Sequence, residues 1–214
     1  MKKVYIFDFD GTLVDSMPFW AQKMLDILDS EGVDYPDNIV SIFTPLGDAG
    51  TAKYMREILG VTLSEEEIFR RMDENAIPKY RDEIPLKEGV YEYLDFLRKQ
   101  GVSLNVLTAS PHHMLDVCLQ RLGVFDWFDH LFSCDDFCLT KAETEIYHQA
   151  LQRIGADIED AVFFDDNIGA VQTAKKAGLY TVGVADDSGL LFRDELIETA
   201  DMFIPTFKDV KLTF

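Results

Sequence analysis

The sequence predicts an α/β protein with a doubly wound parallel sheet and one inserted helical domain. From residue 89 onward, short apolar runs rich in β-branched and aromatic residues alternate with amphipathic stretches. Apolar runs that lie between helices are typical of strands covered on both faces, as in a parallel sheet. Residues 16–84 lack this alternation, and an interruption of roughly seventy residues is far longer than an ordinary crossover connection.

Five strands and four helices form the predicted α/β core. The first strand is an apolar run near the start of the chain, and the others follow residue 89. Pro111 stands where the first residue of a helix is expected. Glycines at positions 101, 123, 155 and 178 follow helical stretches, as is typical just after a helix C-terminus. The predicted strands cover residues 4–9, 103–107, 131–133, 161–164 and 181–184, and the predicted helices cover residues 90–100, 111–122, 144–154 and 169–177.

The stretch between the first and second strands predicts a small helical domain. Ser64 is followed by three glutamates, which is the pattern of a capping box at a helix start. The hinges are predicted at Asp15-Ser16 and at Ile84-Pro85-Leu86. The three predicted helices lie near residues 18–30, 49–59 and 64–80. The expected domains are an α/β catalytic core of residues 1–15 and 85–214 and a helical cap of residues 16–84.

Composition and charge exclude several classes of protein. The chain has 214 residues, of which 47% are hydrophobic, and this is enough for a packed core. Its 20 basic and 39 acidic side chains give a net charge of −19, which repels nucleic-acid backbones and anionic lipids. No apolar run reaches the length of a membrane span, and the run before Asp8 is too short for a signal peptide. We expect a cytoplasmic protein with reduced cysteines and no nucleic-acid or membrane partner; the sequence does not fix the oligomeric state, and a monomer is favoured.

Polar side chains follow four of the predicted strands. The first strand ends in residues 8–12; residues 108–110 follow the second strand, Lys141 follows the third after a loop, and residues 165–167 follow the fourth. In an open parallel sheet, ligands bind in the crevice outside the carboxyl ends of the strands. We therefore expect four carboxylates, a threonine hydroxyl and a lysine ammonium to meet in one crevice.

This combination of groups indicates phosphoryl transfer. Four crowded carboxylates repel one another unless a cation is present, and hard oxygen ligands suit Mg²⁺. A lysine and a threonine can then donate to an oxyanion that the metal also holds. Asp8 and Asp10 are two residues apart, so in an extended segment they face the same way, and one can attack while the other handles the proton. Gly11 permits a sharp turn and a close backbone approach.

Four motifs resemble those of the haloacid dehalogenase-like superfamily of phosphohydrolases. They are Asp8-Phe9-Asp10-Gly11-Thr12-Leu13-Val14-Asp15-Ser16, Thr108, Lys141 and Asp165-Asp166-Asn167-Ile168-Gly169, in the order that the family has them. The resemblance implies a Rossmann-like core with a helical cap inserted after the first motif, similar to the phosphoglycolate phosphatase and β-phosphoglucomutase group. Two departures concern loop shape: Ala142 follows the lysine where the family often has proline, and Asn167 replaces a frequent serine.

The resemblance also implies a role for each motif residue. Asp8 would be the nucleophile that becomes phosphorylated, and Asp10 would protonate the leaving alcohol and then activate water. Thr108 and Lys141 would bind the phosphoryl oxygens. The phosphate-binding residues expected from the resemblance are Asp8, Phe9, Asp10, Thr108, Ala109 and Lys141.

A magnesium ion is the cofactor that the resemblance implies. Asp8 and Asp166 would be direct ligands, Asp10 would contribute its backbone carbonyl, and Asp165 would act through water or as an orienting partner. The expected function is a Mg²⁺-dependent phosphatase that hydrolyses a small phosphorylated metabolite through an aspartyl-phosphate.

Two other functions stay open at this point. A sugar-phosphate mutase of the β-phosphoglucomutase type often has valine after the glycine, whereas Thr12 is similar to the phosphatases. A phosphorylatable receiver-like signalling or binding domain also gathers carboxylates, threonine and lysine around Mg²⁺. There the acidic pair and the phosphorylated aspartate lie on different strands, so the spacing of Asp8 and Asp10 disfavours it.

Three further expectations concern residues whose roles the motifs do not settle. Ser110, just before Pro111, is a candidate cap for the following helix. The turn-rich segment 44–48 is a candidate substrate-specificity loop. The large apolar side chains of the insertion are expected in its core, and they include Phe19, Trp20, Met24, Met55 and Phe69.

Overall fold

The computed structural model describes residues 2–43, 46–208 and 210, and it divides the chain into two compact units. The first, which we call the α/β unit, comprises Met1–Asp15 and Pro85–Phe214. The second, which we call the helical unit, comprises Ser16–Ile84. Within the described ranges, no helix combines the length and the apolar character that crossing a membrane requires.

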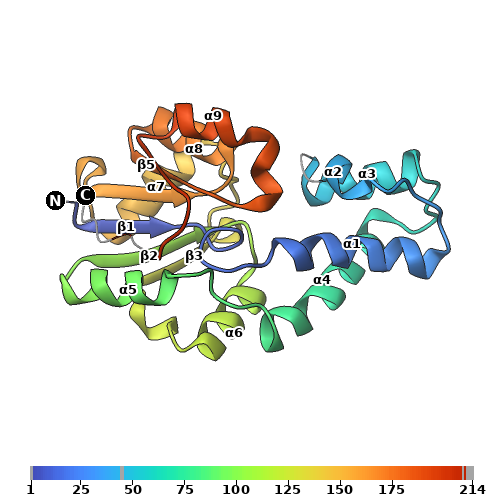
Figure 1. Cartoon of the computed structure of the whole chain (residues 1–214), viewed down its shortest axis with the longest axis horizontal. Coiled ribbons are helices and arrows are strands. Elements are labelled where there is room, and N and C mark those ends of the chain that lie inside the picture. Colours follow the sequence, from blue (N-terminus) through green and yellow to red (C-terminus); the bar gives the residue numbers. More distant parts are fainter. Residues whose placement is uncertain (1, 44–45, 209, 211–214) are drawn as a thin grey trace. The chain divides into compact units, whose positions relative to one another are not determined.

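The α/β unit contains a six-stranded parallel sheet in the order β3-β2-β1-β4-β5-β6 (Figure 1). The predicted doubly wound α/β class is confirmed. One strand, β6, was not expected from the sequence. The strands are β1 (Val4–Phe7), β2 (Ser103–Thr108), β3 (His130–Ser133), β4 (Ala161–Asp165), β5 (Tyr180–Val184) and β6 (Met202–Ile204).

Helices cover both faces of this sheet. In Figure 1, α5 and α6 lie on one side of the sheet, and α8 and α9 lie on the other. Ile6 lies in the same buried apolar cluster as Tyr147 of α7 and Ala170 of α8, and the Phe7 ring packs against the ring of Tyr93 on α5. Such two-sided burial explains why β1 is a continuous apolar run. The helices are α5 (Val90–Lys99), α6 (His112–Leu122), α7 (Thr144–Ile154), α8 (Ile168–Ala177) and α9 (Arg193–Thr199).

Short elements differ from the sequence prediction at Pro111 and at helix α9. Pro111 is the N-cap of α6 rather than its first helical residue. The helix α9 was not predicted. Of the three cysteines, Cys118 and Cys134 are buried, whereas Cys138 is exposed and has a positive φ. Four 3₁₀ turns also occur in the described part, at Phe125–Trp127, Cys134–Asp136, Ile158–Asp160 and Asp187–Phe192.

The helical unit has an apolar core of its own. Ser64 accepts a hydrogen bond from the backbone N–H of Glu67 and so caps the last helix. The short helix α2 was not predicted, because five residues carry too little periodicity. The helices are α1 (Met17–Glu31), α2 (Ile39–Phe43), α3 (Gly47–Glu57) and α4 (Glu65–Asp82). Buried core residues include Met24, Ile27, Leu28, Phe43, Met55, Ile68 and Met72.

The two chain segments that enter and leave the helical unit are paired by backbone hydrogen bonds at their α/β ends. Val14 and Leu86 form an antiparallel bridge, and Asp15 N–H donates to the Pro85 carbonyl at 3.0 Å. The N–H of Lys87 donates to the Leu13 carbonyl at 2.9 Å. Both linkers therefore start from one small backbone ribbon beside the end of β1.

Candidate active site

A tight turn follows β1 and exposes polar groups at the end of the sheet. The N–H of Asp8 donates to the Phe164 carbonyl at 2.8 Å, which continues the pairing with β4. The carbonyl of Phe9 then accepts from the N–H groups of Leu13 and Val14, so β1 ends earlier than the predicted residue 9. The Phe9 side chain itself is fully buried and supports the turn.

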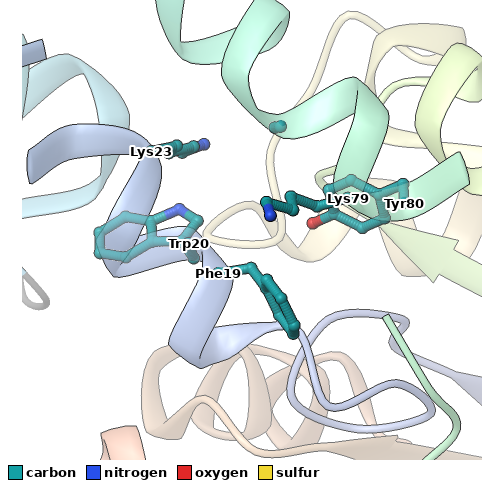
Figure 2. Close-up of a pocket in the computed structure, with 6 residues that line it drawn as sticks. Phe19, Trp20, Lys23, Lys79 and Tyr80 are labelled. Atoms are coloured by element: carbon teal, nitrogen blue, oxygen red, sulfur yellow. The ribbon is translucent and has the colours of Figure 1, made fainter. Parts of the chain in front are cut away.

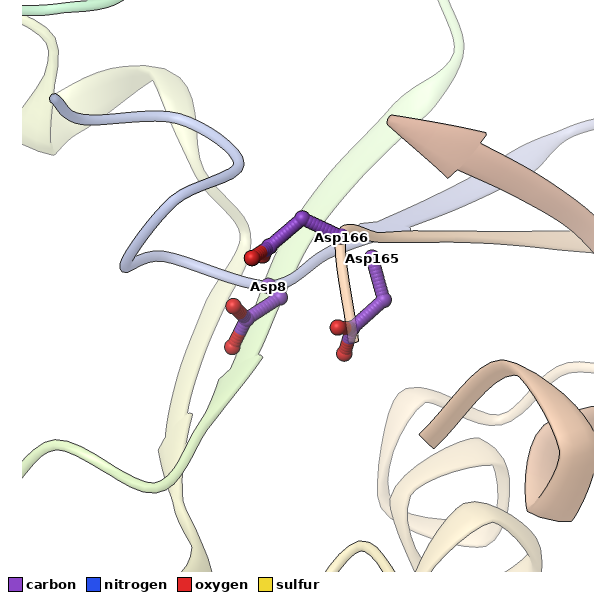
Figure 3. Close-up of side chains that lie close together, drawn as sticks. All are labelled: Asp8, Asp165 and Asp166. Atoms are coloured by element: carbon purple, nitrogen blue, oxygen red, sulfur yellow. The ribbon is translucent and has the colours of Figure 1, made fainter. Parts of the chain in front are cut away.

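Three carboxylates meet at the ends of β1 and β4. Oxygen atoms of Asp8, Asp165 and Asp166 all lie within 4.8 Å of one another. Figure 3 shows Asp8 and Asp166 extending toward the same side, with Asp165 beside them. Asp8 is 4% exposed and Asp165 is fully buried. Residues more than 150 positions apart thus form one acidic cluster, as the strand-end argument predicts.

Lys141 closes this cluster from the loop after β3. Its Nζ lies 2.6 Å from Oδ1 of Asp8 and 2.8 Å from Oδ2 of Asp165. Tyr147, on α7, donates its hydroxyl to the Lys141 carbonyl at 2.9 Å and so anchors the loop. Tyr147 could not be recognised from the sequence as a site residue, because its apolar ring and helical spacing are those of an ordinary core residue.

Burial and charge–charge interactions shift the pKa values of the groups in the cluster. Burial raises the pKa of Asp8 well above its usual range; the ammonium of Lys141 opposes this shift, and Asp165 adds to it. Burial, followed by the negative charges of Asp165 and Asp186, raises the pKa of Asp166 to about 7. Burial alone would lower the pKa of Lys141, but the two neighbouring carboxylates raise it well above its ordinary value.

Asp166 is held in place by a buried hydroxyl. The Oγ1 of Thr12 donates to Oδ1 of Asp166 at 3.0 Å, and the N–H of Asp166 donates to Thr12 Oγ1 at 3.1 Å. Thr12 is fully buried. A valine at this position fills a similar volume but makes neither bond, so the residue after Gly11 has a direct structural role that the sequence analysis did not assign.

The loop after β2 provides a hydrogen-bond donor to Asp10, the second aspartate of the first motif. Thr108 is buried at the end of β2, and its Oγ1 accepts from the N–H of Ser110 at 3.0 Å. The Ser110 hydroxyl donates to the Asp10 carboxylate. Ser110 therefore does not cap α6, whose N-cap is Pro111 without a side-chain bond. Ala109 is exposed at the same strand end.

The acidic cluster fits a hard divalent cation. Its donor atoms are all carboxylate oxygens, and Lys141 forms ion pairs with two of the three carboxylates, Asp8 and Asp165. Asp165 is oriented by the N–H of Asn167, which donates to Oδ1 at 2.7 Å. Asn167 also caps α8 with its own side chain, which leaves the two aspartates before it available for the cluster. Burial and the neighbouring carboxylates raise the pKa values of Asp8 and Asp166, and a bound divalent cation would favour their ionised forms.

Gly11 cannot be replaced without moving Asp166. Its φ is +74°, and a Cβ on it would lie 2.5 Å from Oδ2 of Asp166. Gly123 has the same φ, but a Cβ there meets nothing within 4 Å. We expect Gly11→Ala to lower the free energy of unfolding by more than about 2 kcal/mol and Gly123→Ala by about 1 kcal/mol, measured by urea denaturation. Equal losses would mean that the close approach of Gly11 to Asp166 is not a constraint.

The helical unit has a small pocket between α1 and α4. Figure 2 shows Phe19, Trp20 and Lys23 on α1 and Lys79 and Tyr80 on α4 around it. Met24 and Met55 are buried in the core of the helical unit, and Trp20 and Phe69 pack against that core, as expected. Trp20 also lines the pocket, and Phe19 lines the pocket rather than the core. The pocket is lined by Phe19, Trp20, Lys23, Ala76, Lys79 and Tyr80.

In the described part of the predicted specificity segment 44–48, Asp48 contacts the pocket residue Lys23. Residues 44 and 45 lie outside the described residues, and residues 47 and 48 begin α3 rather than a loop. Asp48 pairs with Lys23 at 3.2 Å, and the Lys23 ammonium also lies 5.6 Å from the centre of the Trp20 ring. These contacts do not test the expected role of the segment in substrate choice.

Known proteins share both the sequence pattern and the fold. Hexitol phosphatase B of Escherichia coli (strain K12) is 29% identical over 185 residues, which cover 84% of this chain and 82% of that protein. A phosphorylated carbohydrates phosphatase of Thermotoga maritima is 26% identical over 174 residues, 81% of each chain. The crystal structure of CbbY from Rhodobacter sphaeroides in complex with phosphate superposes with a TM-score of 0.84 at 23% identity and covers 99% of this chain and 97% of that one.

The family assignment follows from the extent of the match. A family model described as haloacid dehalogenase-like hydrolase matches residues 2–178, a range that contains all four motifs and every residue of the acidic cluster. The expectation from the sequence motifs is confirmed: the chain belongs to the haloacid dehalogenase-like hydrolases.

Proposed function

We propose that this chain is a Mg²⁺-dependent phosphatase that hydrolyses a small phosphorylated metabolite through an aspartyl-phosphate on Asp8. The observation that carries the proposal is the contact of Lys141 with both Asp8 and Asp165, beside Asp166. A carboxylate nucleophile, an ammonium and a cation-binding acidic pair are what transfer of a phosphoryl group to the protein requires.

In the first proposed step, an oxygen of Asp8 attacks the phosphorus atom of the ester. The new bond joins the Asp8 carboxylate to phosphorus, and the bond from phosphorus to the alcohol oxygen breaks. Asp10 gives its proton to the leaving oxygen, which departs as the alcohol. Lys141 and Thr108 donate to the phosphoryl oxygens, and Lys141 also fixes the orientation of the Asp8 carboxylate, to which it already donates.

In the second step, Asp10 takes a proton from a water molecule that attacks the same phosphorus. The bond between phosphorus and the Asp8 oxygen breaks, which releases inorganic phosphate and restores the carboxylate. Ser110, which donates to Asp10, helps to hold it in place for both proton transfers. Asp8, Asp165 and Asp166, with the backbone carbonyl of Asp10, would hold Mg²⁺, which supplies positive charge to offset the negative charge of the phosphoryl group.

The relatives guide the choice of substrate class. Two of them are named as phosphatases of hexitols and of phosphorylated carbohydrates. We therefore propose a phosphorylated sugar or sugar alcohol as the substrate, and the helical unit as the cap that selects it. The large negative charge of the chain also disfavours polyanionic substrates such as nucleic acids.

A panel of phosphate esters tests the proposed function. Hexitol phosphates, sugar phosphates and phosphoglycolate are incubated with the protein in Mg²⁺ or in a chelator, and inorganic phosphate is measured. We expect release in Mg²⁺ only, with at least one sugar or hexitol phosphate preferred. Isomerisation of a sugar phosphate in the presence of a bisphosphate, without net phosphate release, would instead identify a mutase. Persistent phosphorylation without turnover would support the receiver-like alternative.

The pKa of Asp166 predicts how Mg²⁺ stabilises the protein at different pH. Because the pKa is about 7 when folded and about 4 when unfolded, the contribution of this group to stability falls as the pH rises through that window. Mg²⁺ binds the ionised form and removes the repulsion. We expect Mg²⁺ to raise the Tm more near pH 8 than near pH 5.5. Asp166→Asn should show a small shift at both pH values, and an equal shift of the native protein at both would contradict the assignment.

A further inference from the structure

Lys87 makes three hydrogen bonds where the second linker returns to the α/β unit. Its Nζ donates to the Gly11 carbonyl at 2.6 Å, to the Ala185 carbonyl at 2.7 Å and to Oδ2 of Asp186 at 2.8 Å. The side chains of Lys87 and Asp186 are 17% and 6% exposed. All three ammonium protons of Lys87 thus have a hydrogen-bond partner. Because both side chains are largely buried, water has little access to replace these partners.

Lys87 contacts the turn after β1 with both its side chain and its backbone. Its ammonium binds the carbonyl of Gly11, the residue between Asp10 and Thr12, and its backbone N–H binds the Leu13 carbonyl at 2.9 Å. The same ammonium ties that turn to the segment that follows β5. Neither Lys87 nor its partner Asp186 belongs to the motifs that the sequence analysis identified.

We propose that Lys87 is a positioning residue, whose ammonium fixes the Gly11 turn against the Ala185–Asp186 segment and so sets the places of Asp10 and Thr12. The proposal rests on the proposed function, because the positions of Asp10 and Thr12 matter for proton transfer and for holding Asp166. An error of about 1 Å in such groups can cost about a hundredfold in rate. Lys87 itself has no part in the chemical steps.

A second lysine offers a matched comparison away from the acidic cluster. Lys175 donates to the Thr199 carbonyl at 2.7 Å and to Oδ1 of Asp201 at 2.9 Å, which is the same combination of carbonyl and carboxylate partners. Thr199 is the last residue of α9, and Asp201 accepts a hydrogen bond from Thr181 on β5. Neither partner of Lys175 belongs to the turn after β1. Lys175→Met therefore removes an ion pair of the same kind, but a more exposed one with side chains 45% and 28% exposed, without touching the Gly11 turn.

Four variants separate positioning from stability. Lys87→Met removes all three bonds and leaves Asp186 buried without its counter-charge, so a loss of stability is expected. Lys87→Met/Asp186→Asn removes that charge as well, and we expect it to recover most of the lost Tm. Asp186→Asn alone keeps the Lys87 bonds to both carbonyls, and Lys175→Met is the remote control.

Across these variants, we expect the changes in kcat not to parallel the changes in Tm. We expect kcat for the best ester of the panel to fall about tenfold to a hundredfold in both variants that lack Lys87, with KM changed less than about threefold. Asp186→Asn should lose less than about threefold in kcat, and Lys175→Met should keep the kcat of the native protein. If kcat recovered together with Tm in the double variant, Lys87 would be a structural residue only.

Amide hydrogen exchange provides a readout that needs neither metal nor turnover. In the metal-free protein, we expect peptides covering residues 9–14 to exchange about tenfold faster in both variants that lack Lys87, because the turn loses its hold on Gly11. The Lys175→Met protein should exchange at the native rate there. Unchanged exchange in the double variant would overturn the proposal. An absence of phosphatase activity in the native protein would instead contradict the proposed function, and the exchange experiment would still test the hold of Lys87 on the turn.

Discussion

Asp8→Asn is expected to abolish phosphate release, with a fall in kcat on the order of 10⁴-fold or more. An amide oxygen cannot replace the carboxylate as a nucleophile, whereas its shape and its ability to accept from Lys141 are kept. The variant should therefore fold normally. Because burial raises the pKa of Asp8, the neutral side chain should also leave the metal-free protein at least as stable near neutral pH.

The measurement is steady-state phosphate release from the best ester of the panel, together with a urea denaturation curve. Asp126→Asn, at an exposed position in the 3₁₀ turn Phe125–Trp127, is a suitable control and should behave as the native protein does. Retention of more than about 1% of the native kcat by the Asp8→Asn variant would remove Asp8 as the nucleophile.

Lys141→Met is expected to have the second-largest effect, and it should affect both rate and stability. Two buried carboxylates lose their counter-charge, since the Nζ atom contacts Asp8 and Asp165. We expect the free energy of unfolding of the metal-free protein to fall by about 3 kcal/mol at neutral pH. We also expect kcat to fall on the order of 10²-fold to 10³-fold, because a donor to the phosphoryl oxygens is lost.

Lys3→Met provides the matched control for Lys141→Met. Lys3 pairs with Asp160 at 3.1 Å, but its side chain is 73% exposed, so the loss should stay below about 1 kcal/mol. The stability loss of Lys141→Met should also shrink at low pH, where the carboxylates are protonated and need no counter-charge. A Lys141→Met protein with native stability and native kcat would show that the contacts of Lys141 have no catalytic role.

The sequence contains enough information to predict where the acidic cluster forms. Asp8, Lys141 and Asp165 each follow a strand whose apolar pattern is visible in the sequence, and the carboxyl ends of parallel strands necessarily meet at one edge. That these side chains meet could therefore be predicted without knowledge of individual side-chain contacts. The helix α2 was not predictable in this way, because five residues are little more than one helical turn and do not establish a period of 3.6 residues.

The supporting contacts of the site could not be derived from local patterns. Ser110 stands where a helix cap is expected, but its hydroxyl is taken by Asp10, a residue 100 positions earlier in the chain. Tyr147 and Lys87 read as a core aromatic residue and an ordinary lysine after a linker. Their partners become visible only when distant strands are brought together, since a tertiary hydrogen bond leaves no periodic signal in the sequence.

The most direct test of the account is to identify the group that carries the phosphate during turnover. The native protein is mixed with its best ester in Mg²⁺, quenched in acid, digested and examined by peptide mass spectrometry. We expect phosphate on the peptide that contains Asp8, and we expect neutral hydroxylamine to remove it, because hydroxylamine cleaves acyl phosphates. Phosphate on a serine or threonine, stable to hydroxylamine, or phosphate located on a histidine peptide, would contradict phosphorylation of Asp8.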